Sequence, residues 1–306
     1  MVVSEVDYGM EEDRANTYSQ LAIQPASSAL ALAVTDIASM VFNHIKSSLS
    51  TLTVYTVLII TMNTRLDATC EHYKPFPVSA ASQKVLDCLI QPIKIVLTEY
   101  HGEDEDTWGH VEKNGPFSDD CDQRCIFVRR GLVVALASFE DSTSELQLKM
   151  LKFLLAVVLF HETSHFLTRH IFGSEFTPKG IGSYDHKRSC WEAGYKVERE
   201  LIGKYIRAVW PHGRKWGFIS LKRIEIRCDA DVYIIPSTFL DKFLTSLADP
   251  DSRLPLFTDE LSTPMQAEQV LIPYPDNFPR CRLTCDSEEE WEKEKKEKDV
   301  ETAIEL

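Results

Sequence analysis

Positively charged residues are in the minority in this chain. Its 306 residues include 33 Lys and Arg against 47 Asp and Glu, which gives a formal net charge of −14 and a pI near 5.1. An acidic excess of this size argues against a nucleic-acid-binding surface and against binding to an anionic membrane. We therefore expect neither nucleic acid nor a membrane among its partners.

Targeting signals and long hydrophobic runs are also lacking. No uninterrupted apolar run reaches the roughly 18 residues that a membrane-spanning helix needs. The first residues carry neither the basic region nor the apolar stretch of a secretory signal. None of the five asparagines lies in the Asn-x-Ser/Thr pattern for N-glycosylation. Together these absences predict a cytoplasmic protein.

Cysteine is sparse, with eight in the whole chain, which excludes a scaffold held together by disulfides. Cys121 and Cys125 form one C-x-x-x-C pair, and Cys281 and Cys285 form another. Neither pair has the C-x-x-C spacing of a zinc knuckle, so we expect free thiols. A disulfide within or between the two pairs stays open. Apolar residues make up 44% of the chain, enough for a core in one large domain or two sub-domains.

A metal-binding pattern stands in the middle of the chain. Residues 161–165 read His-Glu-Thr-Ser-His and follow an apolar run, residues 153–160, that is typical of a buried helix. On a helix, four residues advance a side chain by about 40° beyond one full turn, so His161 and His165 point the same way. Both imidazoles can then bind one metal ion, and Glu162, about 100° round the helix, can reach a water beside it.

A structural role for the same residues is the alternative interpretation. Two hydrogen-bonded core histidines beside a surface glutamate would satisfy the same pattern. An apolar helix core has little use for two histidines and a glutamate, and burying an unpaired carboxylate costs on the order of several kcal/mol. The metal-binding interpretation is therefore preferred.

The helix that carries the motif has recognisable ends. Residues 142–145, Ser-Thr-Ser-Glu, match a capping box, and the helix is predicted to reach Phe172 with Gly173 just beyond its end. A second helix is predicted over 189–202 and stops at Gly203. These two helices would bring the motif close to the acidic residues that follow it.

The rest of the chain predicts an α+β fold in which a mixed sheet packs against the long metal-binding helix. The C-terminal part is expected to be mostly helical and extended. The run 51–62 is rich in β-branched residues and predicts a buried strand, although a helical continuation stays open. Other predicted elements are helices over 28–46, 82–90 and 237–247, and strands over 93–99, 126–136 (one strand or a hairpin) and 219–235 (one or two).

The domain organisation follows from shifts in composition. Residues 1–20 are predicted to be a flexible N-terminal segment, and residues 21–285 a single catalytic domain with sub-domains over about 21–173 and 174–285. Residues 286–306 are Glu- and Lys-rich and predict a solvated, charged helix or tail.

A catalytic metal site needs a third protein ligand and one open position. The extended pattern H-E-x-x-H-x-x-G-x-x-H fails here because Thr168 and Ile171 stand where glycine and histidine are required. His170 lies about 140° away from the face that carries the two motif histidines, so it is a poor candidate. The third ligand must come from a later segment.

Glu192 is the leading candidate for this ligand. It follows the second motif histidine by 27 residues and is flanked by small residues that would let two helices approach closely. Glu198 and Glu200 are rivals, and Asp185 and His186 stay open. On one continuous helix Glu198 would lie about 240° from Glu192, so the two could not both face the metal. The alternative role for Glu192 is a buried carboxylate paired with a neighbouring base.

Residues 153–203 resemble the gluzincin-type zinc metallopeptidases, in which H-E-x-x-H is followed by a glutamate on a later helix. The spacing is longer here than in the best-known members, and Lys196 stands where an aspartate often occurs. The resemblance implies a zincin-like fold, one Zn²⁺ per chain and a peptide or peptide-like substrate. It also implies that the strand before the metal helix lines the cleft and pairs with extended substrate.

The same resemblance implies a mechanism. Zn²⁺ held by His161, His165 and Glu192 would activate a water molecule, and Glu162 would act as the general base. The hypothesis from the sequence is therefore a zinc metallopeptidase.

A further donor is expected to stabilise the oxyanion, with Tyr195 and His186 as first choices and Tyr184 and His212 as alternatives. Two other functions stay open. One is a metalloenzyme that processes small-molecule amides, and the other is a zinc-binding protein without catalytic activity. Specificity and oligomeric state are not determined by the sequence.

Overall fold

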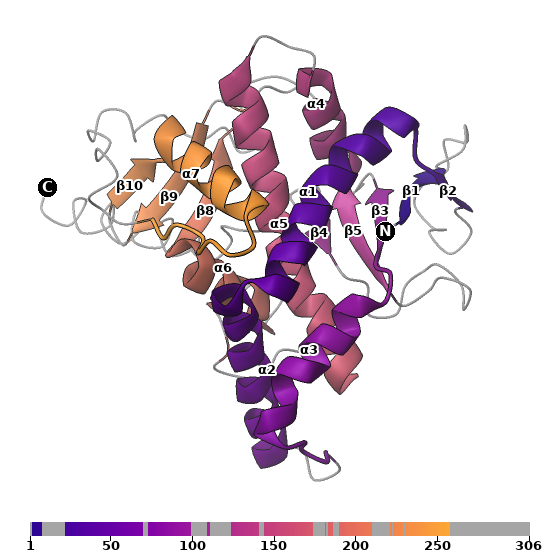
Figure 1. Ribbon diagram of the computed structural model, residues 1–306, viewed down its shortest axis with the longest axis vertical. Helices are drawn as coiled ribbons and strands as arrows, with labels where there is room; N and C mark the ends of the chain where they lie inside the picture. The colour runs from indigo at the N-terminus through magenta and orange to yellow at the C-terminus, as the bar shows by residue number, and fades with distance from the viewer. Residues whose placement is uncertain are drawn as a thin grey trace, which may run out of the picture.

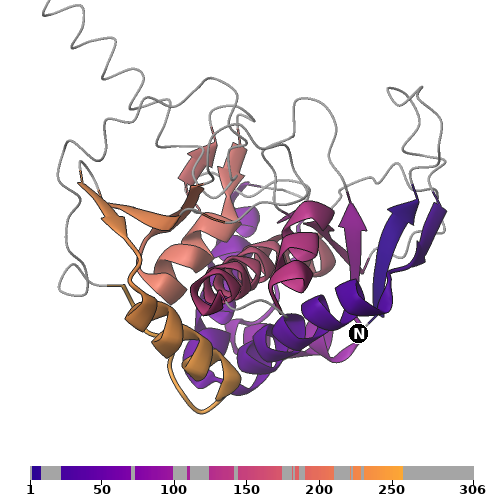
Figure 2. The same ribbon diagram turned by 90° about the horizontal axis from the view of Figure 1, so that it is seen from above.

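The computed structural model describes residues 2–7, 22–69, 73–98, 109–110, 124–140, 144–173, 181, 183–185, 190–209, 221, 223–228 and 231–257. Over these residues the protein is a mixed α+β fold, mostly helical with small sheets. The longest helix, α5 (Glu145–Phe172), runs through the middle of the molecule (Figures 1 and 2). A five-stranded sheet lies on one side of α5 and a three-stranded sheet on the other.

Helix α5 forms the centre of the core because it is apolar almost all round. Every side chain from residue 153 to residue 164 is buried, including the polar residues of the motif. The helix ends as the sequence predicts, at Gly173, which adopts a left-handed conformation (φ 63°). Its start differs, because Ser144 is the N-cap residue and makes no capping hydrogen bond through its side chain. The capping box expected at residues 142–145 is therefore wrong.

The helices that pack most extensively against α5 and complete this core are α1 (Ser28–Ser47), α4 (Arg130–Glu140), α6 (Ala193–Ile202) and α7 (Ser237–Ala248). By length and composition α5 could cross a membrane, although Lys152 interrupts its apolar run. However, 89% of its most apolar window is buried inside the protein. This burial is typical of the central helix of a folded domain.

The five-stranded sheet has the order β2-β1-β3-β5-β4. Its three central strands, β1 (Val2–Asp7), β3 (Lys94–Thr98) and β5 (Cys125–Arg129), are parallel. The outer strands, β2 (Ala22–Pro25) and β4 (Gly109–His110), pair antiparallel. The N-terminal segment, expected to be flexible, thus places residues 2–7 inside a sheet. Strand β4 forms the edge nearest to α5, against which it packs.

Strand β5 corrects two expectations. The strand or hairpin predicted over 126–136 ends at Arg129, and residues from Arg130 form α4, whose buried side chains follow a helical spacing. Strand β5 also has β3 on one side and β4 on the other. Strand β4 pairs with Phe127 and Val128, so at these two residues the outer edge of β5 is not open to an extended substrate as the resemblance implied.

Helix α2 (Leu49–Thr69) corrects the strand predicted over 51–62. Its buried residues recur at helical spacing: Thr51, Tyr55, Leu58, Ile59 and Met62. The hydroxyl groups of Thr53, Thr61 and Thr64 donate to carbonyls one turn earlier, as in the 2.6 Å bond from Thr53 Oγ1 to Leu49 O. Packing of one helix face therefore overrides the strand preference of a β-branched run. The sequence left open that this segment continues as a helix, and the structure shows that it does.

The remaining elements agree with the sequence more closely. The predicted helices α1, α3 (Ala81–Ile90) and α7 are confirmed, as is β3. The region 219–235 contains two strands, β9 (Arg223–Cys228) and β10 (Asp231–Ile234), in the sheet order β10-β9-β8, with β8 spanning Tyr205–Val209. A hairpin of β6 (Ser183–Asp185) and β7 (Cys190–Glu192) precedes α6. The predicted charged tail, 286–306, lies outside the described residues.

His44 on α1 is a buried titratable group away from the motif. Its side chain is fully buried, and neither ring nitrogen has a hydrogen-bond partner within the described part of the chain. Burial lowers the pKa of His44 below its ordinary value of 6.5, and the negative charge of Asp249 offsets only part of this effect. As the pH falls below about 6.5, the unfolded chain takes up a proton that the folded protein resists, so stability decreases.

We predict that His44→Leu makes the protein less sensitive to acid. Leucine has a similar volume and removes the buried base. The free energy of unfolding should then fall less steeply below about pH 6.5, by at most about 1.4 kcal/mol per pH unit. Urea unfolding of wild type and variant between about pH 7.5 and about pH 5 measures the pH dependence of the free energy of unfolding. Identical pH dependence of the two proteins would contradict the proposed effect of His44.

Candidate metal centre

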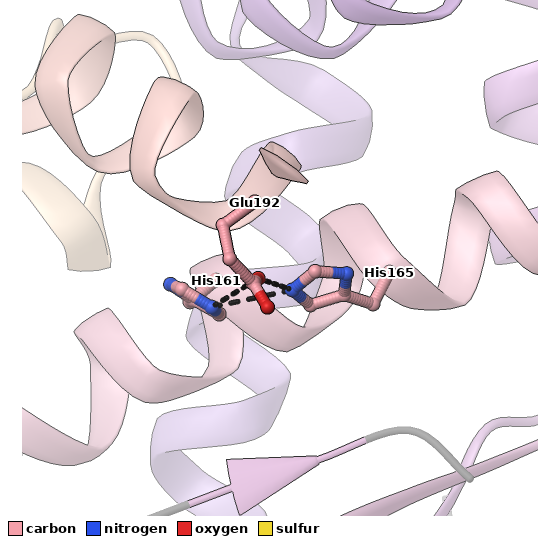
Figure 3. Close-up of side chains that lie close together, drawn as sticks. All are labelled: His161, His165 and Glu192. Atoms are coloured by element: carbon pink, nitrogen blue, oxygen red, sulfur yellow. Dashed lines mark hydrogen bonds and ion pairs between the residues drawn. The ribbon is translucent and has the colours of Figure 1, made fainter. Parts of the chain in front are cut away.

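Three side chains from two segments converge on one point. His165 Nε2 lies 2.8 Å from Glu192 Oε2, and His161 Nε2 lies 3.8 Å from the same oxygen. The two Nε2 atoms are 3.3 Å apart, and the carboxylate lies between the two imidazole rings (Figure 3). A tetrahedral metal with bonds of 2.0–2.1 Å separates its ligand atoms by about 3.3 Å. The largely buried cluster could therefore hold one metal ion.

Helix α5 supplies both histidines from successive turns. Their spacing puts them on one face, as the sequence indicates, and His161 is almost fully buried while His165 is only partly so. The difference arises because His161 faces α6, against which α5 packs. The helix therefore presents one imidazole from the core and one closer to its boundary.

Glu192 reaches the cluster from outside a helix, which corrects the helix predicted over 189–202. It is the last residue of β7 and the N-cap residue of α6, with an extended backbone (φ −112°, ψ 107°). The β6–β7 pairing, in which Glu192 lies opposite Ser183, fixes this position. The angular argument that separated Glu192 from Glu198 assumed one continuous helix, and this premise is wrong, although of the two carboxylates only Glu192 belongs to the candidate metal cluster. Both carboxylates reach His161, one near each ring nitrogen.

Glu198 holds the other side of the His161 ring. One of its carboxyl oxygens makes a short hydrogen bond with His161 Nδ1, and its side chain is completely buried. A metal-ligating histidine commonly donates a hydrogen bond from one ring nitrogen to a carboxylate, which leaves the other nitrogen free to bind the metal. The position of Glu198 beside Nδ1 suits this arrangement. Glu198 lies one turn after Gly194, on the face of α6 that meets His161. That spacing is the signal that could have identified this role from the sequence.

The electrostatics of the cluster favour a bound cation. Burial and the neighbouring His165 lower the pKa of His161 to about 3, so its imidazole is neutral. Burial, followed by the charges of Glu162 and Glu192, raises the pKa of Glu198 well above its usual range. Carboxyl groups thus gather in a poorly solvated site, where their mutual repulsion opposes ionisation. A cation at the cluster would offset that repulsion.

Gly194 permits the close approach of α6 to α5. A Cβ atom at this position would lie 2.3 Å from three atoms of the His161 ring, a separation that real Cβ contacts do not show. The small residues noted in the sequence therefore serve to admit an imidazole. The next residue, Tyr195, packs its buried ring against the His161 ring in a T-shaped arrangement, with ring centroids 5.3 Å apart. Its expected role as an oxyanion donor stays a prediction.

The other sequence candidates fall outside the cluster or outside the described residues. Glu162 is buried beside His161 on α5, and its charge acts on Glu198. Glu200 is exposed on α6 near Arg199. His170 is half-buried, with Nδ1 2.9 Å from Phe166 O. Only the backbone of Tyr184 and Asp185 is described, in β6, and His186 and His212 lie outside the described residues.

Comparison of the chain with known protein families, with curated proteins and with solved structures finds no significant match. A functional conclusion therefore depends on the geometry and chemistry of the site itself.

We predict that Gly194→Ala strongly weakens metal binding. The added methyl group must displace the His161 ring and disturb its bond with Glu198, at a cost of about 1–3 kcal/mol in stability. Affinity for a divalent metal such as Co²⁺ should fall by about 100-fold or more, measured by titration followed by absorbance.

Gly173→Ala is the matched control. Its Cβ would contact nothing within 4 Å, but its backbone is left-handed. Strain of about 1–2 kcal/mol should lower stability without changing metal affinity. Equal metal affinity of the Gly194→Ala variant and wild type would contradict the close contact with His161.

Proposed function

We propose that this protein is a zinc-dependent hydrolase, specifically a metallopeptidase. The observation that carries the proposal is the convergence of His161, His165 and Glu192 within 4.8 Å of one another, on a motif whose intervening glutamate is also buried. Comparable spacing and donor types are used by zinc hydrolases to bind metal and activate water.

The donor set fits zinc better than other common ions. Two imidazoles and one carboxylate suit Zn²⁺, whereas Mg²⁺ and Ca²⁺ prefer all-oxygen sites. Three protein ligands match a catalytic zinc site, because structural zinc sites use four. A bound zinc ion would lower the pKa of a water molecule towards 7 and polarise a substrate carbonyl.

Glu162 is the proposed general base. Its carboxylate accepts a proton from the attacking water and then delivers that proton to the leaving amine nitrogen. Glu198 keeps the His161 ring oriented while this happens. Tyr195, with His186 as the alternative, is proposed to donate a hydrogen bond to the developing oxyanion. Strand β4 is proposed to line the cleft, because it forms the sheet edge that packs against α5.

The burial of the site favours a second candidate function. His161, Glu162 and Glu192 are each less than 10% exposed, and only His165 retains a larger accessible fraction of its side chain, 24%. So little accessible surface suits a small amide or a peptide-derived metabolite better than a folded protein. The chemistry would be the same in both cases, so a substrate panel containing short peptides and small amides separates them.

We predict about one zinc per chain in the purified wild-type protein, and none in His165→Ala, because loss of one imidazole leaves two ligands. His170→Ala is the matched control, since His170 lies on the same helix outside the cluster. Its zinc content should equal that of wild type. Metal mass spectrometry measures all three proteins. Absence of zinc from wild type, even after reconstitution, would remove the basis of the proposed function.

We predict that Glu162→Gln keeps zinc but loses turnover by about 10²–10⁴-fold, since the amide cannot accept the proton. Glu145→Gln, at the exposed start of α5, is the control and should retain full activity. Initial rates on the substrate panel, with zinc content determined for each sample, measure the effect. Full activity of the Glu162→Gln variant would rule out this mechanism.

A further inference from the structure

The backbone of α5 receives additional hydrogen bonds around the metal motif. Three consecutive carbonyls, of residues 159, 160 and 161, each accept a side-chain hydroxyl. Thr163 Oγ1 donates to Leu159 O at 2.6 Å, and Ser164 Oγ donates to the carbonyl of His161 at 2.7 Å. The carbonyl between them, Phe160 O, accepts the phenolic hydroxyl of Tyr55 at 2.7 Å. Added hydroxyl bonds of this kind alter the curvature of a helix.

The bond from Tyr55 differs from the other two in its origin. Thr163 and Ser164 belong to α5 and move with it, whereas Tyr55 belongs to α2, 105 residues earlier in the chain. The second polar contact between these helices, from Thr168 Oγ1 to Met62 Sδ at 3.4 Å, is to a weak sulfur acceptor. Tyr55 is therefore the strong polar tie between the described parts of α2 and α5. It acts on the residue directly before His161.

Helix α2 also contacts the other half of the site. It packs against α6, which carries Gly194 and Glu198, as well as against α5. The ring of Tyr55 is completely buried, so its hydroxyl has no water to exchange with and stays on Phe160 O. A bend of α5 at this point would change the separation between the Nε2 atoms of His161 and His165, which lie one turn apart on this helix. A rotation of α5 would move both rings relative to Glu192 and Glu198, which belong to other segments.

We infer that Tyr55 is a positioning residue for the metal centre. Its hydroxyl sets the rotation and curvature of α5 at Phe160 relative to α6, and thereby holds His161 and His165 in the positions, relative to one another and to Glu192, that a single ion requires. The inference rests on the metal site of the proposed function, but not on the reaction or its substrate. Helix α2, which is distant in the sequence from the motif, thereby contributes to metal affinity through Tyr55.

Tyr55→Phe tests this inference in the full-length protein. The substitution keeps the buried ring and removes one hydroxyl, while Phe160 O keeps its place in the hydrogen bonding of the helix. Tyr73→Phe is the matched control, because the Tyr73 hydroxyl donates at 2.6 Å to Asn63 Oδ1 on the same helix α2, away from the motif. Both variants lose one hydroxyl bond, and both should unfold at a slightly lower temperature than wild type.

Two measurements distinguish positioning from a general loss of stability. Zinc affinity is measured below the unfolding temperature by competition with a chromophoric chelator, and the visible absorption of the Co²⁺-loaded protein reports ligand geometry. We expect Tyr55→Phe to bind zinc about 3–10-fold more weakly and to shift the Co²⁺ spectrum, an effect somewhat below that of losing a direct partner of a ligand. Tyr73→Phe should match wild type in both.

The outcomes separate this inference from the proposed function. Wild-type affinity and an unchanged Co²⁺ spectrum in Tyr55→Phe would overturn the role of Tyr55 and leave the metal site intact. Equal weakening in both variants would also overturn it, because the effect would then be one of stability. Failure of the wild-type protein to bind zinc or Co²⁺ would overturn the metal site, and the role of Tyr55 together with it.

Discussion

Three residues of α6 contact the imidazole of His161, and the rest of the site depends on that contact. Gly194 leaves room for the ring, Tyr195 packs against it in a T-shaped arrangement, and Glu198 bonds to Nδ1. A buried imidazole is costly unless its polar atoms are satisfied. The packing of α6 on α5 is thus set partly by the need to give the ring nitrogens of His161 polar partners. This packing also brings Glu192 close to His161 Nε2.

The polar groups of α5 are accommodated in two different ways. The hydroxyls of Thr163, Ser164 and Thr168 are buried without penalty because they bond to carbonyls of their own helix. The carboxyl groups near the motif differ, because burial, together with the charges of Glu162 and Glu192, raises the pKa of Glu198. A core helix that only needed stability would carry apolar residues here. Accumulated charge in such a place is typical of functional sites.

Long or strongly periodic elements were predictable from the sequence, and two β-branched runs were not. Helix α1 shows a clear helical period, and α5 combines a long apolar run with a terminal glycine, so both were identified. Residues 51–62 and 126–136 are apolar segments whose pattern suits a strand or a helix equally well. Which structure each segment forms depends on the elements that pack against it. The first segment lies in α2, which buries one face against other helices, and the second divides at Arg129 into β5 and α4.

The sequence by itself determined the part of the site that lies within one helix. The i, i+4 spacing of His161 and His165 places both imidazoles on one face, because helix geometry is local. It also ranked Glu192 first among the possible third ligands. Only the tertiary structure decided that Glu192 stands at a strand end, that Glu198 bonds to His161, and that Tyr55 bonds to Phe160 O. These relations join segments far apart in the chain, and their distances are set by how helices pack, which no local pattern encodes.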